Sequence, residues 1–136
     1  MTTSTTMLRL LGSIREHLTT HDLPTPYASV TVACNLIDGD HITVHLRPSL
    51  LPDLAAGLLA WVDTLTKITV TAWRPPHGET VHLTVTGERH DTTRVVVYGG
   101  VDFTEDVFGN LQPGGRQNVA LSVLRSWATG SAGVAA

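Results

Sequence analysis

The chain is poor in the residues and segments on which many recognisable functions depend. Its single cysteine, Cys34, cannot form an intramolecular disulfide, so a reduced, cytoplasmic setting is expected. No run of about 18 apolar residues occurs, which argues against a transmembrane helix and a membrane partner. The first residues form a Thr/Ser run without a positive cluster, so no signal peptide is expected either.

Positive charge is also scarce. The chain has eight arginines and one lysine but 12 acidic residues, which gives a formal net charge of −3. Proteins that bind nucleic acid neutralise the phosphate backbone with clustered Lys and Arg, so general nucleic-acid binding is not expected. A DNA-binding accessory role through Arg116 and Arg125 would need a local patch and is the third hypothesis.

Catalytic motifs are missing as well. There is no Gly-x-Ser-x-Gly elbow, and no motif marks Cys34 as an activated thiol. The segment Pro113–Arg116 precedes an expected helix, but it lacks the strand before it and the Lys-Ser/Thr ending of a phosphate-binding loop. The sequence therefore predicts no catalytic residues, no cofactor-binding residues and no cofactor. It favours a non-enzymatic protein over an enzyme.

Seven histidines raise the question of a metal site. His17 and His21 are four apart on an expected helix, but no Glu or Cys of zinc-like spacing accompanies them. His41 and His45 have the same spacing on an expected strand, where it corresponds to about 13 Å and prevents shared ligation. No metal-ligand set is therefore predicted.

The periodicity of apolar residues predicts one α+β domain over residues 1–136, with frayed ends at about 1–4 and 130–136. Spacings of three and four predict helices over 5–19, with Met7, Leu11, Ile14 and Leu18 on the apolar face, and over 51–65. A capping box predicts a helical turn reaching Phe108, and a last helix with Ala120, Val123, Leu124 and Trp127 inside ends before Gly130.

Alternation of apolar and polar residues predicts strands over 29–32, 41–47, 68–73 and 81–86. The run 94–98 is nearly all apolar, which predicts a fifth strand that is central or covered on both faces. Asp38-Gly39-Asp40 is a hairpin signal between the first two, and Gly99-Gly100 is expected to end the fifth. The resulting order is α-β-β-α-β-β-β-α, a five-stranded, mainly antiparallel sheet with helices packed on one face. Profilin-like and roadblock-like folds share this order, but no motif of those families occurs here.

In its amino-acid composition the chain resembles small proteins of GC-rich actinobacteria. Thr, Val, Ala and Gly are abundant, Arg outnumbers Lys, and phrases such as Leu23-Pro24-Thr25-Pro26-Tyr27 and Val70-Thr71-Ala72-Trp73-Arg74 are typical of them. The resemblance covers roughly residues 23–103 and implies no activity, ligand or partner.

One face of the predicted sheet is the candidate site. Alternation places Trp73 on the face opposite the core, where a large aromatic ring is unusual unless something covers it. The alternative is that the Pro75-Pro76 turn folds the ring inward. The other candidate residues on this face are His45, Thr71, His82, Thr84, Arg94 and Tyr98.

Two functions compete for this face. The first is a small, non-enzymatic interaction or regulatory module that docks a protein partner or forms a homodimer through the face carrying Trp73. The second is a small-molecule or metal-binding protein, or a minor enzyme, that uses His45, His82, Thr84 and Tyr98 as a polar pocket. An ordinary solvated sheet face, in which Thr serves β propensity, explains the same pattern without any ligand.

Overall fold

The computed structural model describes residues 3–23, 26–35, 37 and 39–130. The strands are β1 (Tyr27–Ala33), β2 (His41–Leu46), β3 (Thr66–Trp73), β4 (Thr80–Glu88), β5 (Arg94–Asp102) and β6 (Arg116–Asn118). The helices are α1 (Thr3–Thr20), α2 (Leu51–Val62), α3 (Glu105–Phe108) and α4 (Leu121–Ala128). The predicted α+β class is confirmed, but the described sheet has six strands rather than five.

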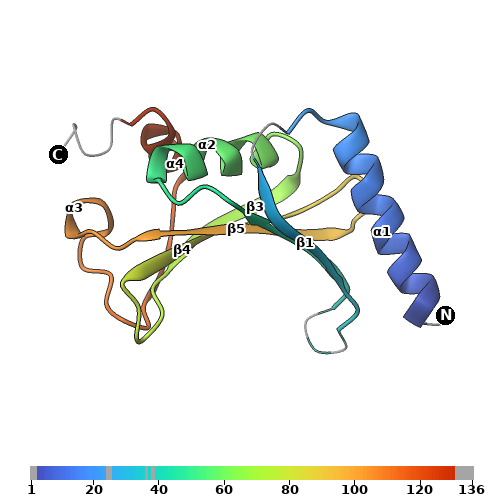
Figure 1. The fold of residues 1–136 in the computed structure, drawn as a ribbon, viewed down its shortest axis with the longest axis horizontal. Helices are drawn as coiled ribbons and strands as arrows, with labels where there is room; N and C mark the ends of the chain where they lie inside the picture. Colours follow the sequence, from blue (N-terminus) through green and yellow to red (C-terminus); the bar gives the residue numbers. More distant parts are fainter. Residues whose placement is uncertain (1–2, 24–25, 36, 38, 131–136) are drawn as a thin grey trace.

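The sheet has the strand order β1-β2-β5-β4-β3-β6. Among the described strand pairs, only β2 and β5 run parallel; the other pairs are antiparallel. Helices α2 and α4 lie above the sheet in Figure 1, and α1 lies at its right, running from above the level of the central strands to below it. None of the described helices covers the lower face of β4 and β5, so this face is left open.

The core lies between this sheet and the helices. Along β4 and β5 the residues facing the helices are buried and the alternate residues are partly exposed. The sequence alternation predicted this for β4, and β5 is central in the sheet as its apolar run indicated, but it is not covered on both faces. From α2, Leu54, Leu58 and Trp61 are completely buried against these two strands. The amphipathic strands and the apolar stripe of α2 thus bury each other, which is the main source of stability in such a layered fold.

Two details of the strands correct the sequence predictions. Gly99-Gly100 does not end β5, which continues to Asp102. A side chain at Gly99 would overlap Cδ1 of Leu54, so the glycine allows α2 to pack closely on the strand. The segment before α4 also pairs with β3 as β6, where Arg116 is the partner of Trp73. Gly99 therefore marks the close approach of α2 to β5 and not the end of the strand.

The helical faces were predicted less exactly. On α1 the buried residues are Leu10, Ser13, Ile14 and His17, whereas Leu11 is 47% exposed. On α4, Leu124 and Trp127 are buried as expected, but Val123 is 40% exposed and Ala120 is an exposed N-cap before the helix. The predictions for Asp38 and for residues 1–2 and 131–136 concern positions outside the described residues. None of the helices in the described ranges is both long and apolar enough for a membrane span.

A buried polar cluster joins α1 to the turn between β4 and β5. Arg89 is 2% exposed and donates hydrogen bonds to Ser13 Oγ (2.6 Å), His17 Nδ1 (3.0 Å) and Asp91 Oδ2 (3.0 Å). A buried guanidinium without such acceptors would be strongly destabilising, so the cluster fixes how α1 sits on the sheet.

Candidate functional site

A row of rings crosses the open face from β2 to β6. The imidazole of His45 stacks on the ring of Tyr98, with 4.7 Å between centroids and 4° between planes. Tyr98 lies 6.3 Å from the ring of His82, which stacks on Trp73 at 5.6 Å. The guanidinium of Arg116 lies 5.8 Å from the centroid of Trp73. We call these five side chains the ring row.

Strand register explains why the ring row forms. His45 is the β2 partner of Tyr98, and Trp73 is the β3 partner of His82. Neighbouring strands are about 4.8 Å apart, which is close to the preferred distance between stacked rings. The nearly parallel rings of His45 and Tyr98, 4.7 Å apart on adjacent strands, each cover a face of the other.

The stacking of its rings limits what the ring row can bind. Proteins that bind single-stranded nucleic acid present ring faces on which bases stack. Between His45 and Tyr98 the facing sides of the two rings are occupied by each other. This pair therefore leaves less ring surface on which a base could stack.

Trp73 lies on the open face, as the alternation predicted. Its ring does not need an external molecule to cover it, because His82 stacks on it and Arg116 lies beside it, leaving the residue partly buried. Folding of the ring into the core around the Pro75-Pro76 turn does not occur, since β3 runs regularly through Trp73. Trp73 is thus a less distinctive binding residue than its position in the sequence indicated.

The other predicted residues also lie on the open face. Thr71 and Thr84 are register partners beside Tyr98. Arg94 is at the opposite end of β5, paired in register with His41 and Glu88, and belongs to a separate part of the face. The structure therefore brings His45, His82 and Tyr98 together and separates Arg94 from them.

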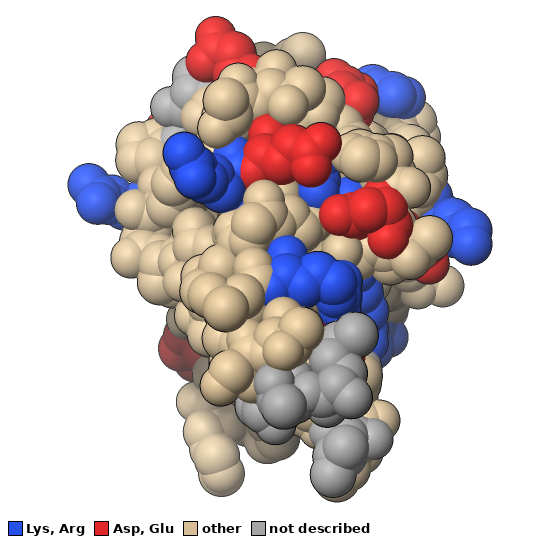
Figure 2. Space-filling model, turned by 90° about the vertical axis from the view of Figure 1, so that its right-hand side faces the viewer, with Lys and Arg blue, Asp and Glu red and all other residues tan. Residues whose placement is uncertain are grey.

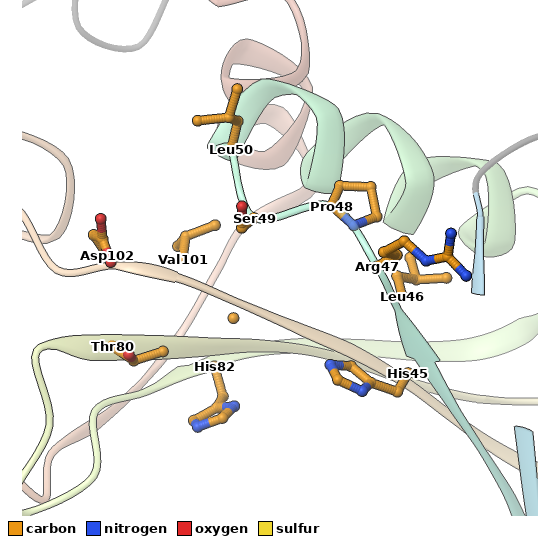
Figure 3. Close-up of a pocket in the computed structure, with 11 residues that line it drawn as sticks. His45, Leu46, Arg47, Pro48, Ser49, Leu50, Thr80, His82, Val101 and Asp102 are labelled. Atoms are coloured by element: carbon orange, nitrogen blue, oxygen red, sulfur yellow. The ribbon is translucent and has the colours of Figure 1, made fainter. Parts of the chain in front are cut away.

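A pocket of about 390 Å3 opens at the end of the ring row, between the end of β2 and the second half of β5. His45 and His82 lie on its lower side in Figure 3, Ser49 lies above, and Thr80 and Asp102 lie to the left. Its volume falls within the range of small-ligand sites, which is about 300–1,000 Å3. The sequence could not reveal this pocket because it depends on β2 lying next to β5.

The pocket exists because β2 leaves the sheet before β5 ends. The parallel ladder stops at His45 and Tyr98, and the chain then turns up into α2. Phe103 donates its backbone N–H to Glu79 on the β4 side. Because backbone groups alternate along a strand, the N–H and C=O of Gly100 and Asp102 point to the side that β2 has vacated. Within the described part of the chain, no strand pairs with this edge.

A second, smaller pocket of about 200 Å3 lies on the helix side of the same edge. Its apolar walls are formed by Leu50, Leu51, Val101, Val107 and Phe108. Both pockets share Ser49, Leu50, Val101 and Asp102. We call the vacated β5 edge together with these two pockets the edge slot: a free strand edge with a polar pocket on one side and an apolar pocket on the other.

The histidines do not form a metal site in the described residues. No group of three His, Cys, Asp or Glu side chains there is arranged to hold a metal ion. His17 and His21 have rings 4.6 Å apart, but both nitrogens of His17 already bond to Arg89 and Thr64. His45 has Tyr98 as its stacking neighbour, and the metal variant of the second hypothesis has no ligand set around it.

Charge of one sign does not gather on the side shown in Figure 2. Basic and acidic side chains lie interspersed there, in the view from the right of Figure 1. At this end Arg9 lies 3.9 Å from Asp40, and Glu16 lies 3.2 Å from Nε2 of His90. This side therefore has no broad basic surface of the kind that binds phosphate backbones.

Comparisons of the chain with protein-family models, with curated proteins and with solved structures gave no match.

Proposed function

We propose that this protein is an interaction module that binds an extended segment of a partner protein in the edge slot. The segment would continue the line of β2 and pair with Gly100 and Asp102 of β5, a mode known as β-strand addition. The observation that carries the proposal is the end of the β2–β5 pairing at His45 and Tyr98, beyond which Gly100 and Asp102 line a cavity.

The two pockets suggest the chemistry of the bound segment. Successive side chains of an extended peptide point to opposite sides. One apolar side chain would enter the pocket of Leu50, Val107 and Phe108, and its neighbours would face the polar pocket of His45 and His82. Leu50 is 68% exposed at the rim, and a bound apolar side chain would cover it. The expected partner sequence is therefore polar-apolar-polar.

The edge slot is a smaller docking site than the whole sheet face that the sequence indicated. Trp73 is partly covered by its neighbours His82 and Arg116, and the other residues of the open face are largely threonine and histidine. Apolar area is characteristic of the buried centre of protein interfaces. The edge slot combines apolar surface with a stretch of β5 that no described strand pairs with, so it supports docking better than the face around Trp73.

A small polar molecule is the second candidate ligand. The pocket beside His45 has the volume for one, and Ser49, Thr80 and His82 bring hydroxyl and imidazole groups to it. A small molecule would use these side chains but would not need the repeating backbone groups of the β5 edge.

A displayed library of random heptapeptides, panned against the full chain, tests the proposal. Enriched peptides should share one apolar residue between polar ones. N-methylation of alternate backbone amides in such a peptide should weaken binding at least tenfold, because each methyl group removes a donor to β5. Methylation of the intervening amides should have little effect.

Leu50→Asp and Val123→Asp form a matched pair for this experiment. Both replace an exposed apolar residue, one at the slot and one on α4. Leu50 is the N-cap of α2, where Asp is favoured, so Leu50→Asp should fold and still reduce peptide affinity at least tenfold. Equal affinities of the two variants, a flat methylation profile, or no enriched peptide would each overturn the proposal. A bound small molecule lost on His45→Ala, without peptide binding, would favour the second candidate.

A further inference from the structure

The strand at the open end of the sheet, β1, lacks the charge and the proline that commonly protect an edge, and its one register irregularity, between Tyr27 and Ser29, lies near the start of the strand. Its seven residues, Tyr27–Ala33, include no charged residue and no proline, and residues 28–31 are exposed. Edge strands are normally shortened, charged or covered, because their free backbone groups pair readily with another strand. The opposite edge, β6, has three residues and begins with Arg116. The two edges are therefore protected to different degrees.

The backbone groups that β1 presents outward belong to Val30 and Val32. Arg47 donates its backbone N–H to Pro26, which shows that odd-numbered residues of β2 bond toward β1. Their partners in β1 are Ser29, Thr31 and Ala33. Since bonding direction alternates along a strand, the N–H and C=O groups of Val30 and Val32 point away from the sheet.

We infer that β1 pairs antiparallel with β1 of a second copy, on a two-fold axis at Thr31. In this register Val30 of each copy exchanges hydrogen bonds with Val32 of the other, which satisfies the outward groups of both residues on each chain. Thr31 then lies opposite Thr31 of the second copy in a non-hydrogen-bonded pair, where side chains are closest and Thr–Thr pairs are favourable.

A second copy is favoured as the occupant because the strand is complementary to itself. Val30 and Val32 lie on the helix side and Ser29 and Thr31 on the open side, and the register preserves both faces across the junction. No charge on the strand opposes its own copy. The axis is perpendicular to the sheet, so both α1 helices lie on the same side.

Exposed apolar side chains near β1 add to this surface. Leu8 is 68% and Leu11 47% exposed on α1, which contacts β1, and Val30 is 39% exposed. A seven-residue strand is about 23 Å long, and with the helix layer the edge is roughly 20 Å thick. The two copies would bury about 900 Å2 in total, close to the roughly 1,000 Å2 of a stable interface. The dimer is therefore expected to dissociate on dilution.

Cysteine cross-linking tests the register in a Cys34→Ser background, which removes the native thiol. Thr31→Cys places two thiols across the axis with Cα atoms about 4.5–5.5 Å apart, within disulfide range. Ser29→Cys, on the same face two residues away, places them about 13 Å apart. Mild oxidation should yield a covalent dimer of the first variant and at least tenfold less of the second.

Val30→Pro tests the interface without a cross-link. The substitution removes an outward N–H, which an edge strand tolerates, so the variant should keep its circular dichroism spectrum. Sedimentation of the wild-type chain over a range of concentrations should show a reversible dimer that Val30→Pro converts to monomer. A wild-type monomer at every concentration, a Val30→Pro dimer, or equal cross-linking at positions 29 and 31 would overturn the inference. If Val30→Pro fails to fold, the pair of cysteine variants still decides. The result does not depend on the edge slot, which lies at the end of β2.

Discussion

Arg89 donates a hydrogen bond from Nε to Nδ1 of His17 at 3.0 Å, which makes a buried cation and a buried imidazole direct neighbours. The bond requires Nδ1 to be unprotonated. On the other side, Nε2 of His17 lies 2.9 Å from Oγ1 of Thr64, whose own hydrogen goes to the carbonyl of Trp61. Nε2 must therefore carry the proton, and the surroundings of His17 select one neutral tautomer.

The stability of the fold should decrease as the pH falls from about 6.5 to 4. Burial, followed by the charges of His21 and Arg89, lowers the pKa of His17 from 6.5 to about 4. The unfolded chain therefore takes up a proton in this window that the folded chain refuses, which costs about 3 kcal/mol of unfolding free energy. Urea titrations at pH 7 and pH 4.5 measure the loss. His17→Asn, whose Oδ1 still accepts from Arg89, should have a flatter profile; an equal slope in both chains would contradict the assignment.

Asp91→Asn should destabilise the protein by about 2 kcal/mol at pH 7, because it removes a charged acceptor from buried Arg89. Partial burial would raise the pKa of Asp91, but hydrogen bonds from Ser13 and Thr93 and the charge of Arg89 lower it to about 2. The wild-type chain loses this stabilisation as the pH falls from about 4 to 2, so the two chains should converge there. Asp63→Asn, at an exposed carboxylate, is the control and should change little at either pH.

Gly99→Ala should destabilise the fold by roughly 1–3 kcal/mol, because its methyl group would overlap Leu54. Leu54→Ala removes the obstructing side chain and leaves a cavity of its own. In the double variant the new methyl group enters that space, so the combined loss should be smaller than the sum of the single losses. Thermal unfolding of the four chains measures the coupling, and strict additivity would show that the two residues do not contact each other.

Gly12→Ala and Gly130→Ala should change stability in opposite directions. Gly12 lies inside α1 with nothing within 4 Å of an added Cβ, so alanine should stabilise the protein by about 0.5–1 kcal/mol. Gly130 follows α4 with φ of +74°, where alanine is strained and should cost about 1 kcal/mol. Chemical denaturation distinguishes the two, and a destabilising Gly12→Ala would indicate that α1 does not pack as described.

The sequence was most informative where the periodicity of a single strand determines which face a side chain occupies. Two-residue alternation placed Trp73, His82, Tyr98 and His45 on one face, because a strand fixes the side of each residue locally. Strand order depends on contacts between distant segments, so the stacking of His45 on Tyr98 and the edge slot could not be read from alternation.

Local rules also failed for particular residues. Glu88-Arg89-His90-Asp91 reads as an ordinary polar turn, and nothing in it indicates that Arg89 is buried under α1. Trp61 is a core residue of α2 that no prediction singled out, although its spacing of three from Leu58 and seven from Leu54 was a usable signal. Leu11 was assigned to the core because an apolar residue with helical spacing normally lies there.

The parallel junction of β2 and β5 has a consequence for how the chain folds. It joins residues that are 53 positions apart, such as His41 and Arg94, whereas β3, β4 and β5 follow one another through short turns. Closing the longer loop has the greater entropic cost, so the three-stranded meander should form first and the β1–β2 hairpin should dock afterwards. Substitutions at this junction, such as Val44→Ala, should then accelerate unfolding more than they slow refolding. The last region to assemble would be the one that contains the edge slot.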